Sequence, residues 1–308
     1  MSAGISQVNL RKASEKPLSR RRRKGVHRNG RTPEGAQRYW CRECGKTFGE
    51  TQDTILKYTK KSLDVWRRYV ECMINRFSLR KSAEVCGISI HVAFAWRHKI
   101  LDALQNMMEQ VRLDGVVEAD ETFLAISYKG RHKQGYMPRD PHKRGEKATK
   151  RGISREKVCV PCGVNMGGMS IAKVSNLGRP RWNDIDKVLG GKVEEGSVLV
   201  TDSFKGYSKL AYEMGVDHIR IKTKKHTEGP FNIQLLNSYH ERLKDMVNRR
   251  FRGVSTKYLN NYLVYHNLVN FSKGTDSFKE ETMFNFTLST RCPRRYVDIP
   301  TRAAIPLL

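Results

Sequence analysis

Three acidic residues interrupt an apolar, β-branched stretch of the chain, and this combination restricts the folds that the chain can adopt. Residues 116–128 read VVEADETFLAISY, with Glu118, Asp120 and Glu121 inside a run that is typical of a buried strand. Side chains alternate between the two faces of a strand, so Glu118 and Asp120 share one face and Glu121 lies on the other. A buried carboxylate is costly unless it is paired or binds a metal. The fold must therefore supply a compensating partner at this strand.

The rest of the chain is strongly basic. Its 308 residues contain 58 Lys and Arg against 31 Asp and Glu, a net charge of +27, and the pI is near 10.0. Positive charge that recurs in blocks indicates a polyanionic partner, most commonly nucleic acid. The alternative is a cationic surface used only for solubility or membrane adhesion. Hydrophobic residues make up 38% of the chain and the mean hydropathy is −0.62, which suits two or three packed domains under a polar surface.

The sequence also bears on the compartment. No apolar run approaches the roughly 18 to 20 residues that a membrane span needs. No hydrophobic segment follows the basic N-terminus, so we expect neither a membrane span nor a signal peptide. The seven cysteines are odd in number and irregularly spaced, which argues against a disulfide framework and for a reducing compartment. We expect a cytoplasmic protein without a membrane partner.

A cysteine pair in the N-terminal region is typical of a zinc knuckle. Cys41 and Cys44 enclose two residues and precede Gly, Lys and an aromatic residue, a spacing that suits a tight turn around sulfur. Zinc needs four ligands, however, and only one such pair is present here. His27 and His98 are available as substitutes, but neither has convincing spacing. Bound Zn²⁺ and an unmetallated knuckle therefore both remain open.

Residues 61–110 predict a helix-turn-helix. Ser78 can cap the first of two short helices, Gly87 can adopt the positive φ of the turn, and Ser89 can cap the second helix. The second helix is expected to pack through Val92, Phe94 and Trp96 and to expose its basic residues, as a recognition helix does. A plain helical hairpin is the alternative. The residues expected to contact DNA from this domain are Arg80, Lys81, His91, Arg97, His98 and Lys99.

From residue 116 onward the pattern changes to strands. Three strands are followed by a helix, a strand, a helix, a strand and a longer helix over 233–251. Antiparallel strands followed by βαβ units give a mixed sheet with helices on its faces. A ribonuclease-H-like fold requires this succession, though other folds share it. The basic loop 129–155 either touches DNA or is solvated, and Cys159 and Cys162 are interpreted as buried packing residues.

Two of these strands carry an aspartate whose side chain can bind a metal ion. Asp120 lies on the first strand, and Asp202 ends the apolar run SVLVTDS. If the two strands lie side by side, the carboxylates repel each other unless a divalent cation lies between them. Mg²⁺ or Mn²⁺ suits such a site, and two ions roughly 3.5 to 4 Å apart serve phosphoryl transfer.

A third ligand is expected from the helix that follows. Asn237, Glu241 and Lys244 stand at i, i+4 and i+7, so they line one face of that helix. An amide oxygen can coordinate a hard cation, whereas chemistry alone favours the carboxylate of Glu241. The arginines expected to contact phosphates near the metals are Arg242, Arg249 and Arg250.

The order of several motifs resembles one known family. CRECGKTF, SLRKSAEVCGIS, EADETF, VLVTDSFKGY and LNSYHERLK follow one another between about residues 30 and 270. The chain resembles transposases of the insertion-sequence 1595 family, which carry an ISXO-type DDE domain. The resemblance implies a DNA transposase with a catalytic Asp120, Asp202 and Asn237 that hold two Mg²⁺ or Mn²⁺ ions, and with Lys244 as the downstream basic residue. The chain departs from the family pattern because it has no cysteine pair upstream of Cys41 and Cys44.

The resemblance also implies a multidomain α/β (α+β) protein. A basic, disordered N-terminus (1–30) and a partial zinc-ribbon-like segment (31–60) precede the helix-turn-helix domain (61–110). A ribonuclease-H-like catalytic domain with a mixed five-stranded sheet (111–275) and a C-terminal tail (276–308) follow. The expected partners are double-stranded DNA, as inverted repeats and target, and further copies of the chain on that DNA. The alternatives are a non-catalytic helix-turn-helix DNA-binding protein and a metal-dependent nuclease on the same fold.

Overall fold

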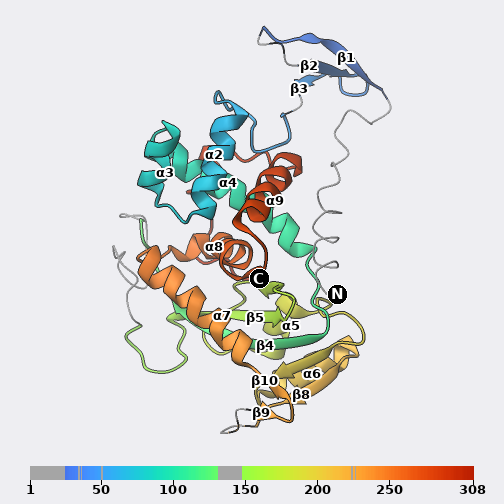
Figure 1. The fold of residues 1–308 in the computed structure, drawn as a ribbon, viewed down its shortest axis with the longest axis vertical. Coiled ribbons are helices and arrows are strands. Elements are labelled where there is room, and N and C mark those ends of the chain that lie inside the picture. Colours follow the sequence, from blue (N-terminus) through green and yellow to red (C-terminus); the bar gives the residue numbers. More distant parts are fainter. Residues whose placement is uncertain are drawn as a thin grey trace. The chain divides into compact units, whose positions relative to one another are not determined.

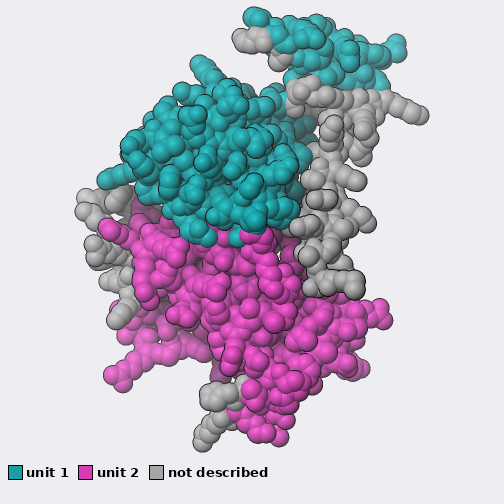
Figure 2. Space-filling model, in the orientation of Figure 1, with its two compact units in different colours: residues 1–107, 275–301 teal, residues 108–274, 302–308 magenta. Residues whose placement is uncertain are grey.

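The chain forms two compact units. The computed structural model describes residues 25–33, 35, 37–49, 51–130, 148–222, 225 and 227–308. Unit 1 draws its described residues from 1–107 and 275–301, and unit 2 draws them from 108–274 and 302–308 (Figures 1 and 2). The prediction for the N-terminus falls outside the described residues up to position 24, and so does that for positions 131–147 of the basic loop.

Unit 1 begins with a small antiparallel sheet. Its strands β1 (Val26–Arg31), β2 (Gln37–Cys41) and β3 (Thr47–Gly49) pair in that order, and the expected cysteine pair lies at the turn between the last two. Within the turn, the backbone N–H of Cys41 donates to the carbonyl of Lys46 at 3.0 Å. The sheet therefore presents a tight loop carrying both cysteines.

Three helices follow, and the predicted caps and turn between the last two are present, although the second of these, expected to be short, has 20 residues. They are α2 (Leu63–Ile74), α3 (Leu79–Cys86) and α4 (Ile90–Glu109). Ser78 Oγ accepts the N–H of Lys81 and Ser89 Oγ accepts the N–H of Val92, each at 3.2 Å, so both serines act as N-caps. Gly87 has φ 58°, the left-handed conformation that a glycine adopts without strain. Indole rings of α2 and α4 stack with centroids 3.7 Å apart.

The C-terminal segment returns to unit 1 instead of forming a tail. Residues 276–289 form the helix α9 (Asp276–Ser289), which packs on α2. The Arg67 guanidinium lies 4.2 Å from the ring centroid of Phe284 and 3.8 Å from the Glu280 carboxylate. The sequence does not predict this helix, because its partner lies more than 200 residues earlier in the chain.

Unit 2 contains the expected mixed five-stranded sheet. Its strands are β4 (Val116–Ala125), β5 (Lys157–Asn165), β6 (Ser170–Ala172), β7 (Val198–Thr201) and β8 (Asp217–Arg220), in the order β6-β5-β4-β7-β8. The pairs β4–β5 and β5–β6 are antiparallel, whereas β4–β7 and β7–β8 are parallel. The α/β fold class and the strand succession are thus confirmed.

Helices cover both faces of this sheet. On one face, α5 (Trp182–Leu189) and α6 (Lys205–Met214) share a buried core with Val117 and Ala119 of β4. On the other, α7 (Gln234–Asp245) packs on β4 and β5 (Figure 1). The predicted apolar residues Leu236, Tyr239 and Leu243 of α7 are buried, and so is Val247 just beyond its end. Each face of β4 therefore meets a different helical layer.

The remaining elements complete the two units. The helix α7 continues as the π-helical η2 (Met246–Arg250), and α8 (Leu259–Tyr265) continues as the π-helical η4 (His266–Phe271). The short elements are β9 (Thr227–Glu228), β10 (Phe231–Asn232), η3 (Thr256–Tyr258) and η5 (Tyr296–Asp298). In the described part of the chain, no helix has the length and apolar character needed to cross a bilayer.

Candidate functional site

Asp120 and Asp202 lie side by side where the parallel pairing of β4 with β7 ends. The last paired residues of β4 and β7 are Ala119 and Thr201, and the next position on each strand is an aspartate. Asp202 Oδ1 accepts the backbone N–H of Phe204 at 2.8 Å, which orients its side chain at the start of α6. The structure therefore brings together the two aspartates that the sequence singles out.

The electrostatics of Asp120 are unusual for a carboxyl group. Burial raises its pKa to about 7, and the negative charges of Glu121 and Asp202 add to the shift. The Lys244 ammonium on α7 acts in the opposite direction and lowers the pKa of Asp120. A cation at this place would favour the ionised carboxylate strongly, since it would replace repulsion by attraction.

The neighbouring acid, Glu121, belongs to the opposite face of the sheet, as predicted. Its Oε2 accepts a hydrogen bond of 3.0 Å from the Tyr207 hydroxyl of α6. Burial raises the pKa of Glu121, while the Tyr207 hydrogen bond and the positive charge of Arg179 lower it. Arg179 therefore acts on Glu121 only through its charge, and the direct contact is a tyrosine that the sequence did not predict.

Three residues of α7 are predicted to be ligands or phosphate contacts. Asn237, Glu241 and Lys244 are all exposed on this helix. Lys244 acts electrostatically on Asp120 and thereby joins the site. In the part of the chain that the structure describes, no hydrogen bond or ion pair joins Asn237 or Glu241 to either aspartate. The choice between them as third ligand stays a prediction.

The donor chemistry at the two aspartates fits a hard divalent cation. Mg²⁺ binds through one or two carboxylates and completes its shell with waters and phosphate oxygens. Among the described residues, no three His, Cys, Asp or Glu side chains are grouped so that they could hold a metal alone. A cation at Asp120 and Asp202 therefore needs further oxygen donors, which an amide, water or a phosphate would supply.

The cysteine pair offers only half of a zinc site. Hydrogen bonding from Cys44 lowers the pKa of the Cys41 thiol, which favours the thiolate that binds metal. The other five cysteines are buried free thiols in other elements, as the packing interpretation predicted. Structural zinc takes four ligands, so the donors present at this turn do not fit a complete site. We assign no role to zinc.

The residues expected to contact DNA from the helix-turn-helix differ in exposure. Arg80, Lys81 and His91 are exposed, and Lys99 is half-buried. Arg97 and His98 are 3% and 0% exposed, so the prediction that they face DNA is wrong. Arg97 donates to the carbonyl of Phe77 at 2.8 Å, and His98 packs against the Phe94 ring. Val92, predicted to pack, is exposed instead.

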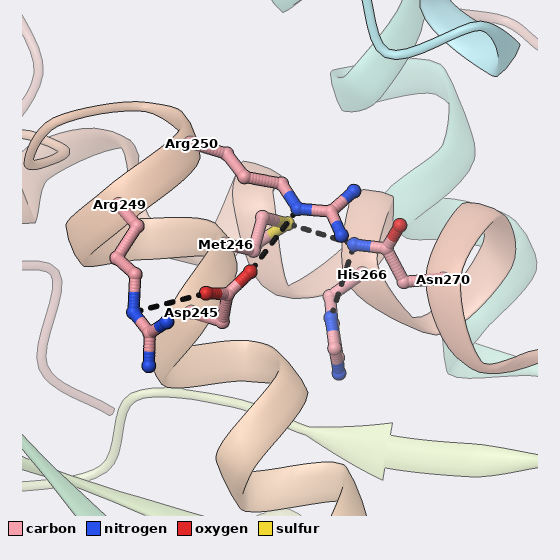
Figure 3. Close-up of polar contacts among 6 residues, drawn as sticks. All are labelled: Asp245, Met246, Arg249, Arg250, His266 and Asn270. Atoms are coloured by element: carbon pink, nitrogen blue, oxygen red, sulfur yellow. Dashed lines mark hydrogen bonds and ion pairs between the residues drawn. The ribbon is translucent and has the colours of Figure 1, made fainter.

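Exposed arginines mark the end of the α7–η2 helix, as predicted. Arg242, Arg249 and Arg250 all face solvent. Figure 3 shows Asp245 between the last two, with Nε of Arg249 at 3.2 Å and Nε of Arg250 at 3.1 Å from its carboxylate oxygens. The wider π-helical turn lets residues at i+4 and i+5 reach the same carboxylate. Exposed pairs of this kind contribute little to stability and leave both arginines accessible to another anion.

Comparisons with known proteins agree with the resemblance found in the sequence. The profile of the ISXO2-like transposase domain matches residues 112–265. A curated relative, the uncharacterized protein in transposable element ISH50 of Halobacterium salinarum, is 25% identical over 180 residues. That match covers 56% of this chain and 58% of the relative, so the chain spans little more than half of the relative's length.

Solved structures give a weaker likeness. The crystal structure of a pre-cleavage Mos1 transpososome has a TM-score of 0.31 at 9% identity, covering 71% of this chain and 74% of that one. The mariner Mos1 paired end complex with Mg has a TM-score of 0.32 at 9% identity, covering 75% and 78%. TM-scores this low do not establish a shared fold.

Proposed function

The chain belongs to the ISXO2-like transposase family, and from this premise we propose that it is the DNA transposase of an insertion sequence. The observation that carries the proposal is the pair Asp120 and Asp202, which directly follow the last paired residues of the neighbouring parallel strands β4 and β7. The raised pKa of Asp120 and the nearby Lys244 ammonium support it further. Sites in which acids shift one another's pKa values are candidates for catalysis.

The proposal includes a ribonuclease-H-like catalytic domain. The order β6-β5-β4-β7-β8, with two antiparallel pairs followed by two parallel ones, supports this interpretation. In this arrangement the two aspartates stand on the central strand and its parallel neighbour. Helices α5 and α6 cover the face opposite Asp120, and α7 covers the face that Asp120 shares with Glu118.

Asp120 and Asp202 would hold divalent cations, with Asn237 as a further oxygen donor. When bound, Mg²⁺ or Mn²⁺ lowers the pKa of an attacking water or hydroxyl and stabilises the leaving oxygen. The side chains orient the substrate: Lys244 and the exposed arginines Arg242, Arg249 and Arg250 bind the phosphates on either side of the scissile bond. Water would first attack the phosphodiester at the element's end and break its P–O3′ bond, which frees a 3′-hydroxyl. That hydroxyl would then attack a phosphodiester of the target DNA and displace the target's 3′-oxygen.

Unit 1 would supply DNA recognition. The N-capped helices α3 and α4 meet at the left-handed Gly87, and α3 and the start of α4 expose Arg80, Lys81 and His91. This arrangement supports a helix-turn-helix with α4 as the recognition helix. Joining two element ends in one reaction would require more than one copy of the chain on DNA.

The experiment that tests the proposal uses the full chain and the DNA that flanks its coding region. The parent should cut this DNA in Mg²⁺ and join the ends to a target, whereas Asp120→Asn and Asp202→Asn should bind but not cut. Asp217→Asn, an exposed aspartate on the neighbouring β8, is the matched control and should act like the parent. Cutting by both variants at the parent's rate would refute the catalytic role. Cutting without joined products would identify a nuclease.

A further inference from the structure

Both ends of the α7–η2 helix are held by charged side chains from β4 and its continuation. At the N-terminal end, Glu118 Oε2 accepts the backbone N–H of Leu236 at 2.8 Å, and the N–H of Leu235 interacts with the same carboxylate. Glu118 is buried. Ile233 occupies the N-cap position, and its side chain accepts no hydrogen bond. Locally, Asn232 Oδ1 accepts the first helical N–H, that of Gln234, at 3.0 Å, and the carboxylate from the distant strand serves the next two.

At the other end, Lys129 binds the three carbonyls that directly follow the helix. Its Nζ donates to the carbonyl oxygens of Phe251, Arg252 and Gly253 at 3.0, 3.0 and 2.7 Å. These three contacts use every donor of the ammonium group. Arg252 and Gly253 have φ of 50° and 86°, so the chain has left the helix at these residues, and Lys129 binds the carbonyls at its exit. Lys129 therefore caps the C-terminal end.

The two side chains have the signs that a helix favours at its ends. A helix carries partial positive charge at its N-terminus and partial negative charge at its C-terminus, so an acid at the first and a base at the second are both stabilising. The interaction also offsets the cost of burying Glu118, for which the described part of the chain shows no basic partner. The Glu118 carboxylate and the Lys129 ammonium come from one short segment of the chain. They therefore hold α7–η2 against β4 and also prevent it from sliding along the strand.

The hydrogen bond between Glu118 and Leu236 lies next to the proposed site on both β4 and α7. Glu118 precedes Asp120 by two residues on the same face of β4, and Leu236 directly precedes Asn237 on α7. Any shift of α7 along the strand would move Asn237 and Lys244 relative to Asp120. In catalysis, a displacement of about 1 Å costs roughly 10²-fold in rate.

We propose that Glu118 and Lys129 are positioning residues, which set the place of α7 on β4 and thereby bring Asn237 and Lys244 into register with Asp120. The catalytic part of this inference rests on the proposed function. The contacts of Glu118 and Lys129 with the two ends of α7–η2, which we call the clamp, do not rest on it, because they exist in protein without metal or DNA. Two measurements are therefore needed, one for the clamp and one for its effect on the reaction.

The first measurement is hydrogen exchange of the full chain without metal or DNA. Glu118→Ala should speed exchange of the amides in the first turn of α7 by about tenfold or more, because their acceptor is lost. Glu118→Gln should leave it near the parent's rate, since the amide oxygen accepts the same bond. Lys129→Met should speed exchange at the η2 end. Unchanged exchange in both Glu118→Ala and Lys129→Met would overturn the clamp.

The second measurement is DNA cleavage at saturating Mg²⁺ and DNA. Glu118→Ala should lower kcat about 10²-fold with unchanged Kd for DNA, and Glu118→Gln should restore it. The matched control is Asp184→Ala, which removes an acid that accepts the Arg181 N–H at the start of α5. That helix, in the same unit, also has a carboxylate at its N-terminal end, but the acid comes from its own first turn and the helix lies on the opposite face of the sheet. Its loss should reduce stability and leave kcat unchanged.

The outcomes separate the two ideas. Equal kcat in Glu118→Ala and Asp184→Ala, or loss of kcat in Glu118→Gln, would overturn the positioning role. A parent that does not cut DNA with Mg²⁺ or Mn²⁺ would refute the proposed function and the positioning role with it. The hydrogen-exchange result would still decide whether Glu118 and Lys129 hold the helix.

Discussion

The Tyr207 hydroxyl donates to Oε2 of Glu121 at 3.0 Å, and this bond ties β4 to α6 on the face opposite Asp120. Burial keeps the pKa of Tyr207 well above its ordinary value, so the hydroxyl remains a donor. Two adjacent acids of one strand thereby have separate environments. Asp120 faces the positive charge of Lys244, and Glu121 faces a neutral donor.

Removing that donor should destabilise unit 2. In Tyr207→Phe the Glu121 carboxylate loses its hydrogen bond in a largely buried place, which should cost about 1–3 kcal/mol of unfolding free energy. Tyr212→Phe on the same helix is the matched control, because Tyr212 is 84% exposed and its hydroxyl meets solvent. Urea unfolding followed by circular dichroism measures both. Equal midpoints for the two variants would show that the bond does not stabilise the fold.

The third ligand can be assigned by comparing two exposed residues one turn apart on α7. Asn237→Ala should reduce Mg²⁺-dependent cleavage by about 10²- to 10³-fold, since a metal contact is worth several kcal/mol in the transition state. Glu241→Ala should stay within a few-fold of the parent. Single-turnover cleavage rates at several Mg²⁺ concentrations give the answer. Loss of cleavage in the Glu241 variant alone would reassign the ligand.

DNA affinity should depend on the exposed basic residues of unit 1 and not on the buried ones. Replacing Arg80 and Lys81 by Ala should weaken binding and reduce the slope of log K against log salt by about 0.9 for each phosphate that is no longer neutralised. Arg97→Ala should instead lower the stability of unit 1, because the Phe77 carbonyl loses its donor. Fluorescence anisotropy at several salt concentrations distinguishes these effects. An unchanged slope in the Arg80 and Lys81 variant would contradict this prediction.

The stability of unit 2 should fall in acid because of His266. Burial lowers the pKa of this histidine from 6.5 to about 3, and its Nδ1 lies 3.3 Å from the Asn270 amide nitrogen (Figure 3). The unfolded chain therefore takes up a proton below about pH 6.5 that the folded chain refuses until about pH 3. Stability should drop across that window, by up to ~1.4 kcal/mol per pH unit, and be unaffected by this group above it.

His266→Phe tests this pH dependence directly. Phenylalanine keeps an aromatic ring against Tyr239, whose ring centroid lies 4.7 Å away, but cannot be protonated. Its urea midpoint should vary less between pH 6.5 and 4 than that of the parent. Val269→Ala, a truncation in the same π-helical segment, should lower the midpoint equally at every pH. Parallel curves for the parent and His266→Phe would rule out His266 as the source.

Local patterns predicted much of this architecture. The alternation along β4 placed Glu118, Asp120 and Glu121 on their correct faces, because side-chain direction in a strand follows from its two-residue period. Ser78, Gly87 and Ser89 marked helix ends correctly, because caps and left-handed turns depend on neighbouring backbone groups. Such features need no knowledge of distant residues.

The errors came from contacts between distant parts of the chain. Arg97 and His98 were expected to be exposed, but α4 is buried well beyond its predicted packing face. Asp102 of this helix pairs with Arg294 at 3.5 Å, a partner nearly 200 residues later. The bond from Leu236 to Glu118 spans 118 positions and was likewise not predictable from local patterns. Periodicity describes one element at a time and does not reveal which element will cover it.

The return of α9 to unit 1 means that no single break in the chain separates the two units. A fragment ending near residue 107 would lack the helix whose Phe284 and Glu280 contact Arg67. One genetic crossover between two such genes could therefore not exchange unit 1 for another intact unit 1. An exchange that keeps both units intact needs more than one break in the chain, because residues 108–274 interrupt unit 1.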